Sequence, residues 1–325
     1  MATVVKSMAT AGVDGYMVEI EASTIKGQQH ITFEEARKSL VSMNLINGFL
    51  FDSVTEDEEN AKIVIRIILE RVLGKKLADI RVTPQKVFNG VDKKYHGIRL
   101  DMHITETAEN EGLKATVYDV EMEDREADRP ALPRRQRYYS ALSDSKKLAT
   151  STDYIKLPNY VSVTILSYDP FLLGDMYYEA RMSLVSHKYS DYQYDDGIVN
   201  IFLYAGGRIN TEDEAYGKKL KEMLKYIVSG EKPNITDDDI ETLDSIVTKV
   251  KFNAEVTKEY MKQWDREATI AREVEEATKR EAGLEFIRCG REDGAPDDKI
   301  RERLEKRLGI SRAVIDELFK QIDSE

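Results

Sequence analysis

The stretch KATVYDVEMED, residues 114–124, alternates β-favouring residues with acids. Successive side chains of a β-strand point to opposite faces of the sheet. Asp119, Glu121 and Glu123 therefore share one face, and Tyr118 begins the opposite, apolar face. Acidic residues are depleted in strands. A row of carboxylates along a strand therefore calls for a partner that tolerates or uses the negative charge.

A second stretch, GIRLDMHIT over residues 97–105, has the same alternation. Asp101 and His103 lie on its polar face. The link ETAENEG, residues 106–112, is rich in turn-favouring residues, so the two stretches are predicted to form a hairpin. In a suitable register, Asp101 meets Glu121 on the polar face.

Carboxylates placed opposite each other destabilise a sheet, and their repulsion raises at least one pKa. A bound divalent cation removes this penalty. Magnesium takes one or two carboxylates together with water and a substrate phosphate, and it can activate a water molecule for attack. The alternative is a solvent-exposed sheet face with scattered acids, which an acidic strand on its own would favour.

The composition limits the class of protein. The chain has 325 residues, 41% of them hydrophobic, which is enough for one large domain with an appendage or for two domains. A single cysteine, Cys289, and four histidines argue against a disulfide framework and against Cys- or His-rich metal sites. The sequence has no apolar run of membrane-spanning length and no secretory signal, so we expect a soluble cytoplasmic protein without a membrane partner.

The formal net charge is −12. A protein that coats nucleic acid is usually basic, because phosphate contacts dominate that affinity. The charge therefore argues against a coating role, but it is compatible with an enzyme that carries a local basic patch beside an acidic metal site.

Periodicity and turn signals predict the order of elements. Thr32 and Glu35 form a capping-box pattern at the start of the first helix. The next helix ends at Gly74, with Ile63, Ile67, Val64 and Ile68 expected on its buried face. The expected helices cover residues 32–43, 57–74, 134–148 and 216–230, and the expected strands cover residues 16–22, 79–88, 97–105, 113–123, 160–168 and 195–207.

Beyond residue 235 the strand pattern disappears, and helices are expected with breaks at Gly283, 290–296 and 308–311. We therefore divide the chain into an N-terminal extension, an α/β core and a helical C-terminal region, with bounds 1–46, 47–230 and 231–325. The last two helices form either a helix-turn-helix that contacts DNA or, as the favoured alternative, a hairpin used for packing. The charged helix over 261–280 either mediates a homodimer or covers the core.

The ordered series HGIRLDMHI, VYDVEMED, LPRRQRYYSAL, YVSVTILSYDPF and DDGIVNIFLYAGG, preceded by NLINGFLFDSV, resembles the PD-(D/E)XK nuclease family. The resemblance is to its transposase-like, recombination-promoting branch and covers residues 43–230. It implies a restriction-endonuclease-like α/β/α core with a small mixed sheet, followed by an all-α region. It also implies a bacterial DNA endonuclease that uses Mg²⁺ or Mn²⁺ and acts in DNA mobilisation or recombination.

The resemblance assigns roles to individual residues. Asp101 and Glu121 match the two signature acids and would ligate the metal together with the backbone carbonyl of Met122. Glu59 matches a helical acid that assists in some members, and its neighbour Glu58 is an equal alternative.

On the helix that follows the acidic strand, the resemblance implies phosphate binding by Arg134, Gln136 and Arg137, with Tyr139 beside them. Arginine binds phosphate in a bidentate manner. The arginines and tyrosines of this helix act either as a phosphate clamp with stacking rings, or as an exposed basic face with tyrosines packed on the sheet.

One position departs from the family pattern. The third signature residue is usually Lys, and in this branch often Gln, but here it is Glu123. A glutamate cannot supply positive charge, although it can ligate metal or act as a base toward water. Two readings follow: an active endonuclease in which Glu123 is catalytic, or a weakened or inactive nuclease fold that serves as a DNA- or protein-binding module. The basic candidates on the same strand face are Arg99 and His103.

Overall fold

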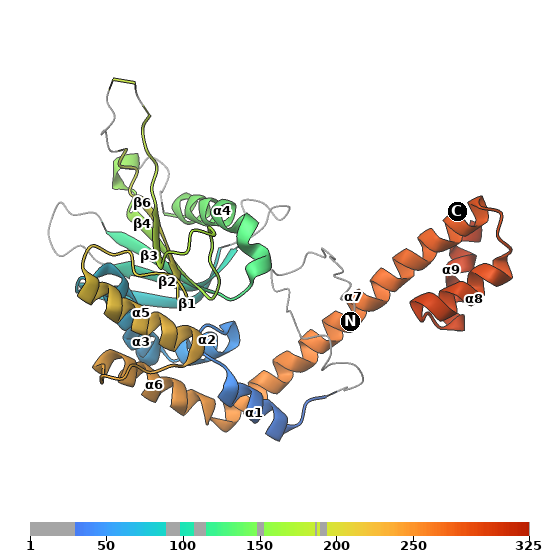
Figure 1. Ribbon diagram of the computed structural model, residues 1–325, viewed down its shortest axis with the longest axis horizontal. Helices are drawn as coiled ribbons and strands as arrows, with labels where there is room; N and C mark the ends of the chain where they lie inside the picture. Colours follow the sequence, from blue (N-terminus) through green and yellow to red (C-terminus); the bar gives the residue numbers. More distant parts are fainter. Residues whose placement is uncertain are drawn as a thin grey trace. The chain divides into compact units, whose positions relative to one another are not determined.

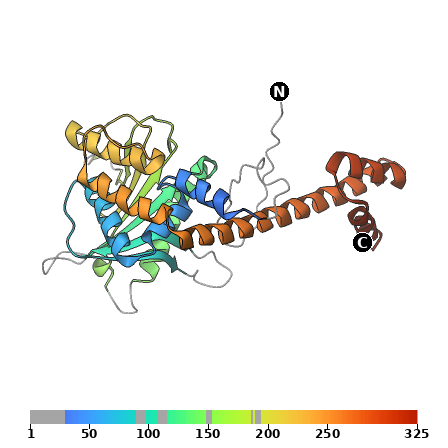
Figure 2. The same cartoon turned by 90° about the horizontal axis from the view of Figure 1, so that it is seen from below.

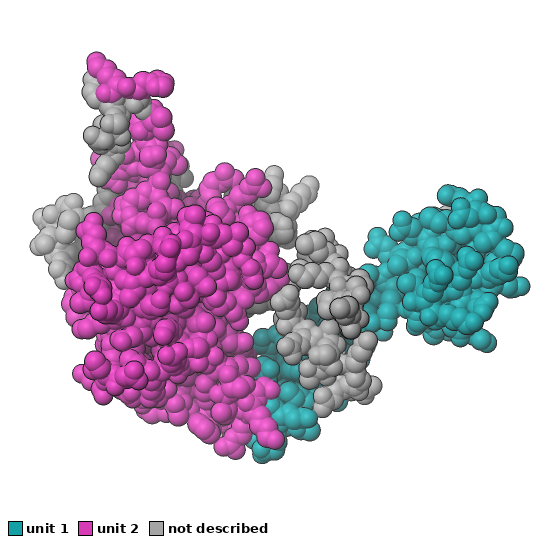
Figure 3. Space-filling view, viewed as in Figure 1, with its two compact units in different colours: residues 1–36, 258–325 teal, residues 37–257 magenta. Residues whose placement is uncertain are grey.

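A computed structural model describes residues 30–88, 98–106, 115–147, 153–185, 187–188 and 194–324; the side chains of 85–88 and 98–100 are not part of this description. The strand expected over 16–22 lies outside the described residues. The chain forms two compact units (Figure 3). One unit comprises residues 37–257, and the other comprises residues 1–36 with 258–325.

The larger unit contains a six-stranded mixed sheet (Figure 1), which confirms the predicted α/β class. The strand order is β1-β2-β3-β4-β6-β5. Neighbours within β1-β2-β3 are antiparallel, β3, β4 and β6 are parallel, and β5 pairs antiparallel with β6. The strands are β1 Ile80–Phe88, β2 Ile98–Glu106, β3 Thr116–Glu123, β4 Asn159–Leu166, β5 Tyr177–Ala180 and β6 Ile198–Tyr204.

Helices cover both faces of the sheet (Figures 1 and 2). One face packs against α2, α3 and α5, with α6 packed on α2 and α3, and the other face is covered by α4. Ile240 and Leu243 of α6 belong to the core of this unit, although α6 follows the expected boundary at residue 230. The helices are α1 Phe33–Ser42, α2 Gly48–Thr55, α3 Glu58–Leu73, α4 Leu132–Ser145, α5 Glu214–Ser229 and α6 Asp238–Lys251, with 3-10 turns at Glu126–Ala131 and Tyr154–Lys156.

The alternation predicted for β3 is confirmed. Tyr118 and Val120 lie in the apolar core shared with α2 and α3. Asp119, Glu121 and Glu123 lie on the opposite face, which α4 covers. The side-chain period of two therefore sorts this strand into an apolar face and an acidic face.

The structure confirms the predicted capping box at the start of α1 and the predicted end of α3 at Gly74. The capping box forms, since Thr32 N–H donates to Glu35 Oε2 at 2.9 Å and Glu35 N–H donates to Thr32 Oγ1 at 3.3 Å. Gly74 ends α3 with a φ of 64°. This is the left-handed conformation that glycine adopts without steric penalty.

The buried face of α3 was predicted only in part. Val64 and Ile68 are fully buried as expected, but Ile63 is 40% exposed and Ile65 is buried in its place. The run KIVIRIIL has apolar residues on too many sides to define one stripe. Contact with the sheet therefore selects the face that is buried.

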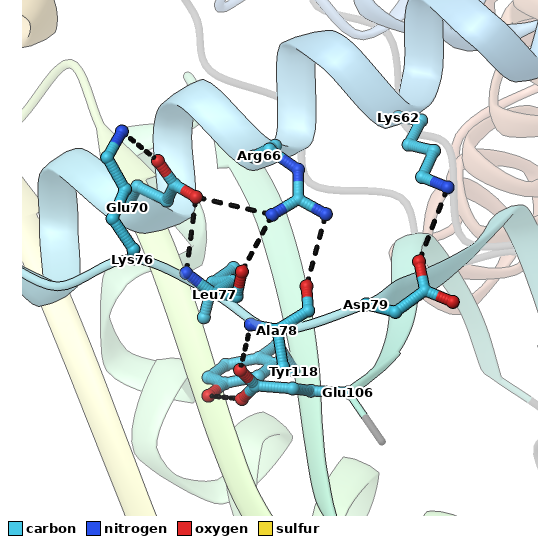
Figure 4. A network of polar contacts seen from close by, with 9 residues as sticks. All are labelled: Lys62, Arg66, Glu70, Lys76, Leu77, Ala78, Asp79, Glu106 and Tyr118. Atoms are coloured by element: carbon cyan, nitrogen blue, oxygen red, sulfur yellow. Dashed lines mark hydrogen bonds and ion pairs between the residues drawn. The ribbon is translucent and has the colours of Figure 1, made fainter. Parts of the chain in front are cut away.

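A polar network attaches α3 to the sheet (Figure 4). Arg66 donates to the carbonyl oxygens of Leu77 at 2.9 Å and Ala78 at 3.1 Å. Glu106 at the end of β2 accepts from Ala78 N–H at 2.9 Å and from the Tyr118 hydroxyl at 2.6 Å. The network fixes the segment that leads into β1 and links it to β2 and β3.

The smaller unit contains the C-terminal helices α8 Asp297–Leu308 and α9 Arg312–Ser324, with most of α7 Ala254–Glu292, from Lys258 onward. Ile287, Ile300, Leu304, Ile315 and Leu318 are among the residues of its core. The hairpin of α8 and α9 turns at Gly309, where a break was expected.

The break predicted at Gly283 is wrong, because α7 continues through this residue. A Cβ at position 283 would lie 2.7 Å from the side chain of Leu318 and 3.1 Å from that of Ile310. Glycine is therefore needed here for close approach of neighbouring side chains and not to end the helix.

Two cationic residues one turn apart on α3 test the network. We expect Arg66→Met to lower the free energy of unfolding by about 2 kcal/mol, because two backbone carbonyls lose their donor. Lys62→Met removes only an exposed ion pair with Asp79 and should change it by less than about 0.5 kcal/mol. Urea denaturation of both variants measures the difference, and equal effects would contradict the assigned role of Arg66.

Candidate functional site

Asp101 and Glu121 meet where the β2–β3 ladder ends. The paired register places Met102 opposite Val120, so one further step places Asp101 opposite Glu121. Glu121 Oε1 accepts from Asp101 N–H at 3.2 Å, and Asp101 Oδ2 accepts from Met122 N–H at 3.1 Å. Each carboxylate is thus held by the backbone of the opposite strand.

The two carboxylates repel each other in a site with little solvent. Glu121 is only 8% exposed. Burial raises its pKa well above the ordinary value, and the charge of Asp101 raises it further. The nearby Arg135 guanidinium acts in the opposite direction. The chain therefore maintains an electrostatic conflict that a cation would relieve.

Arg135 of α4 is the cation that reaches this site. Its guanidinium forms an ion pair with Glu123, which is 6% exposed and also accepts from Arg125 N–H at 3.0 Å. Burial disfavours the charged guanidinium, but the charge of Glu123, the hydrogen bond to Glu123 and the charge of Glu121 together outweigh this effect and raise the pKa of Arg135. Arg135 therefore remains protonated beside two acids.

The helical period explains why Arg135 is selected. Leu132, Gln136 and Ser140 form the buried stripe of α4. Arg135 and Tyr139, four residues apart, lie beside that stripe and are partly buried. The sequence alone does not distinguish Arg135 from Arg134 and Arg137, because the contact of α4 with β3 and β4 decides which side of the helix is buried.

The phosphate-binding candidates from the sequence lie elsewhere on the same helix. Arg134 and Arg137 are exposed. Gln136 is 2% exposed, and its side-chain amide donates to Thr164 Oγ1 of β4 at 3.0 Å. The structure therefore places Gln136 between α4 and the sheet, while Arg134 and Arg137 lie on the solvent side of the helix.

Tyr139 is a further residue of the site. Burial raises the pKa of its hydroxyl, and the negative charge of Glu121 raises it further. A hydroxyl held in the protonated form can donate a hydrogen bond to an anion. Tyr139 and Arg135 thus add two donors from α4 to a site whose acids come from β2 and β3.

His103 does not stand alone on the acidic face. Its Nδ1 lies 2.6 Å from Asp119 Oδ1, and its Nε2 lies 3.3 Å from Lys147 Nζ. His103 and Asp119 are 6% and 1% exposed. This chain of contacts ties β2 to β3 and to the segment after α4. The side chain of Arg99 lies outside the described residues.

Glu59 is not next to the carboxylate pair. It is exposed in the first turn of α3, a helix that packs on the apolar face of the sheet. The backbone of Met122, in contrast, faces Asp101, because its N–H donates to that side chain. The N–H and C=O groups of one strand residue point to the same side in an antiparallel pair, so the Met122 carbonyl also faces β2.

The oxygen atoms gathered here have the chemistry of a hard-cation site. Mg²⁺ is usually held by one or two carboxylates, with water and phosphate completing the shell. Asp101, Glu121 and the Met122 carbonyl match this donor set. Within the described ranges, no group of three or more His, Cys, Asp or Glu side chains is arranged to hold a metal ion.

Comparison of the chain with models of protein families, with curated proteins and with solved structures found no match. Of the helices in the described part of the chain, none combines the length and apolar character needed to cross a membrane.

The charge conflict predicts a pH-dependent gain of stability on neutralising Glu121. We expect Glu121→Gln to raise Tm by roughly 2–4 °C near pH 7.5 in EDTA. The folded-state pKa of Glu121 lies above its ordinary value of 4.5. Below pH 4.5 Glu121 is protonated and does not destabilise the folded wild-type protein. As pH rises through the folded-state pKa, ionisation of Glu121 lowers the stability of the folded protein.

The gain should vanish as pH falls toward 4.5, where Glu121 becomes protonated in both states. Thermal melts of both proteins across this range test the prediction. Glu59→Gln is the matched control, because Glu59 is exposed in the first turn of α3 and its neutralisation should not raise Tm. A gain that is equal for both variants, or independent of pH, would contradict the conflict at Glu121.

Proposed function

We propose that the chain is a divalent-cation-dependent DNA endonuclease of the PD-(D/E)XK type, in the transposase-like group that its sequence resembles. The observation that supports this proposal best is the pair of opposed carboxylates at the end of the β2–β3 ladder, with Arg135 beside it. The mixed sheet with helices on both faces is compatible with a restriction-endonuclease-like core. We place this activity in the bacterial cytoplasm.

Asp101, Glu121 and the carbonyl of Met122 would hold Mg²⁺ or Mn²⁺. The bound cation would polarise the scissile phosphate and lower the pKa of the attacking water. The carboxylates of Asp101 and Glu121, held by backbone N–H groups, fix the position at which phosphate enters. They also keep its negative charge away from the strand unless a cation is present.

Arg135 replaces the missing lysine of the signature. In the proposed reaction its guanidinium donates to a non-bridging phosphate oxygen and offsets the charge that develops there. Glu123 then acts as a positioning residue for Arg135, since their ion pair holds the guanidinium beside Glu121. Glu123 thus holds the positively charged guanidinium of Arg135, a residue of α4, beside the carboxylate pair.

The reaction is hydrolysis. A bond forms between the water oxygen and phosphorus, and the bond between phosphorus and the leaving oxygen of the DNA backbone breaks. The proton lost by water leaves to solvent or to the leaving oxygen. Tyr139, whose hydroxyl remains protonated near Glu121, donates to the phosphate as it approaches.

The second candidate is a nuclease fold that binds DNA or protein without cleaving it. The observation in its favour is that the Glu123–Arg135 ion pair occupies the guanidinium before any substrate is present. The exposed Arg134 and Arg137 supply phosphate contacts in either case.

Plasmid nicking with Mg²⁺ or Mn²⁺ separates these candidates. The wild-type protein should convert supercoiled DNA to open circles, and Asp101→Ala or Glu121→Ala should reduce the rate by at least about 100-fold. Cleavage that survives both substitutions would refute the site. DNA binding without cleavage under either cation would support the second candidate, and calorimetry with Mn²⁺ would show whether the carboxylates bind metal.

Neighbouring arginines on α4 provide a sharper test. Arg135→Gln should lower kcat by about 100-fold or more, because it removes a donor to the transition state. Arg134→Gln should leave kcat within about threefold and mainly weaken DNA binding in a salt-dependent way. Tm is measured for both variants. Because Arg135→Gln leaves the buried Glu123 carboxylate without its ion-pair partner, the double variant Glu123→Gln/Arg135→Gln serves as a further control. Equal effects on kcat would overturn the role of Arg135.

A further inference from the structure

The loop DPFLLGD, residues 169–175, follows β4 and exposes two neighbouring leucines. Leu172 is 70% exposed and Leu173 is 63% exposed. Scattered exposed leucines are common on proteins. These two are unusual because many hydrogen bonds and ring contacts hold the loop that carries them.

Asp169 holds the loop from within. Its carboxylate accepts from the N–H groups of Phe171 at 3.1 Å, Leu172 at 2.9 Å and Gly174 at 2.7 Å. It also accepts from the Tyr178 hydroxyl at 3.2 Å. Four bonds to one carboxylate leave this loop little freedom.

Contacts from outside the loop add to its rigidity. The Arg208 guanidinium donates to the Leu173 carbonyl and to Asp175, each at 3.0 Å. The Phe171 ring packs edge-on against Tyr178 and Phe202, with centroids 5.0 and 5.2 Å away. The leucines therefore project from a preformed support.

Leu172 has a φ of 59° and is the one non-glycine residue in the described ranges with a positive φ. This conformation is unfavourable for a leucine, and such residues cluster where strain serves a function. A glycine or asparagine would adopt it more readily. The chain thus holds an apolar side chain in solvent at a position where a polar or small residue would be more stable.

The loop borders the candidate site. Parallel strands β3 and β4 end at the same edge, where Glu123 pairs with Leu166. Phe171 packs against an apolar cluster that includes Leu132, the first residue of α4, so the loop lies on the face that α4 and the carboxylates share. Leu172 is six residues beyond Leu166, a reach of at most about 20 Å, which is shorter than one turn of B-DNA at about 34 Å.

Guanidinium groups lie around the loop. Arg208, whose side chain is 74% exposed, donates to the Leu173 carbonyl and pairs with Asp175. The Arg129 guanidinium, which pairs with Glu126, lies over the Tyr168 ring. Arg134 is exposed in the first turn of α4. Two apolar tips flanked by guanidinium groups complement bases flanked by phosphates.

We propose that Leu172 and Leu173 form a rigid wedge that enters a base step of DNA and unstacks it beside the carboxylate site. This inference rests on the proposed nuclease function. Leucine side chains that enter a base step open the stack and kink the duplex. The wedge favours DNA with unpaired or weakly stacked bases next to the scissile phosphate, because opening them takes less free energy.

Fluorescence of 2-aminopurine tests the wedge, because unstacking of this base increases its emission. The full chain is mixed in EDTA with paired duplexes and with duplexes that carry a small bubble, so that hydrolysis does not interfere. The wild-type protein should increase the emission and prefer the bubble. The variant with Leu172→Asn and Leu173→Ser should bind about tenfold more weakly and leave the emission unchanged.

Leu172→Asn suits the left-handed backbone, so the fold should be retained, and an unchanged Tm verifies it. Leu173→Met keeps an apolar tip and should behave like wild type. The matched control combines Ile235→Asn and Val185→Ser, which remove side chains that are 81% and 89% exposed at other places. This control should leave binding and emission unaltered.

Several outcomes overturn the wedge: equal binding and emission for the leucine variant, a wild-type protein that leaves the emission unchanged, or one that binds no DNA. Loss of self-association, or of binding to anionic vesicles, as the sole effect of the leucine substitutions would assign the tips to a protein or lipid partner instead. Nicking in Mg²⁺ distinguishes the two proposals. Cleavage without unstacking would support the nuclease function and refute the wedge. Unstacking without cleavage would support the wedge and refute the nuclease function.

Discussion

The repulsion between Asp101 and Glu121 is the constraint on which this site depends. The buried carboxylate of Glu121 and the partly buried carboxylate of Asp101 face each other at the place where β2 and β3 stop exchanging backbone hydrogen bonds. In water each would be ionised and well solvated. Here burial and mutual repulsion raise the pKa of Glu121, so the folded chain is least stable when both carboxylates are charged. A site with this property gains most from a cation.

The surrounding structure limits that conflict without removing it. Backbone N–H groups hold both carboxylates in place, and Arg135 approaches from α4 with a charge that opposes the repulsion. Glu123 binds that guanidinium and keeps it beside the pair. The positive charge beside the carboxylates therefore comes from a helix that crosses the strands, and the charged residues that β3 itself contributes to this face are all acids.

The opposite face of the sheet supplies the stability that such a polar layer cannot. Tyr118, Val120 and Met102 belong to the large apolar core beneath α2 and α3. The network around Arg66 and Glu106 fixes the start of β1 to the same helix (Figure 4). Apolar burial on one face thus fixes the strands while the other face holds charges close together. The rigid loop that carries Leu172 lies at the edge of this second face.

The amino-acid sequence alone sets the two faces of each strand, because a period of two leaves no choice once a strand is assigned. It also determined the ends of α1 and α3, since capping residues act locally. It brought Asp101 toward Glu121 through the hairpin. Tertiary structure decided which face of α3 is buried and why α7 passes through Gly283. It also decided which arginine of α4 meets the acids: three arginines share four positions, and only the contact of that helix with β3 and β4 selects Arg135.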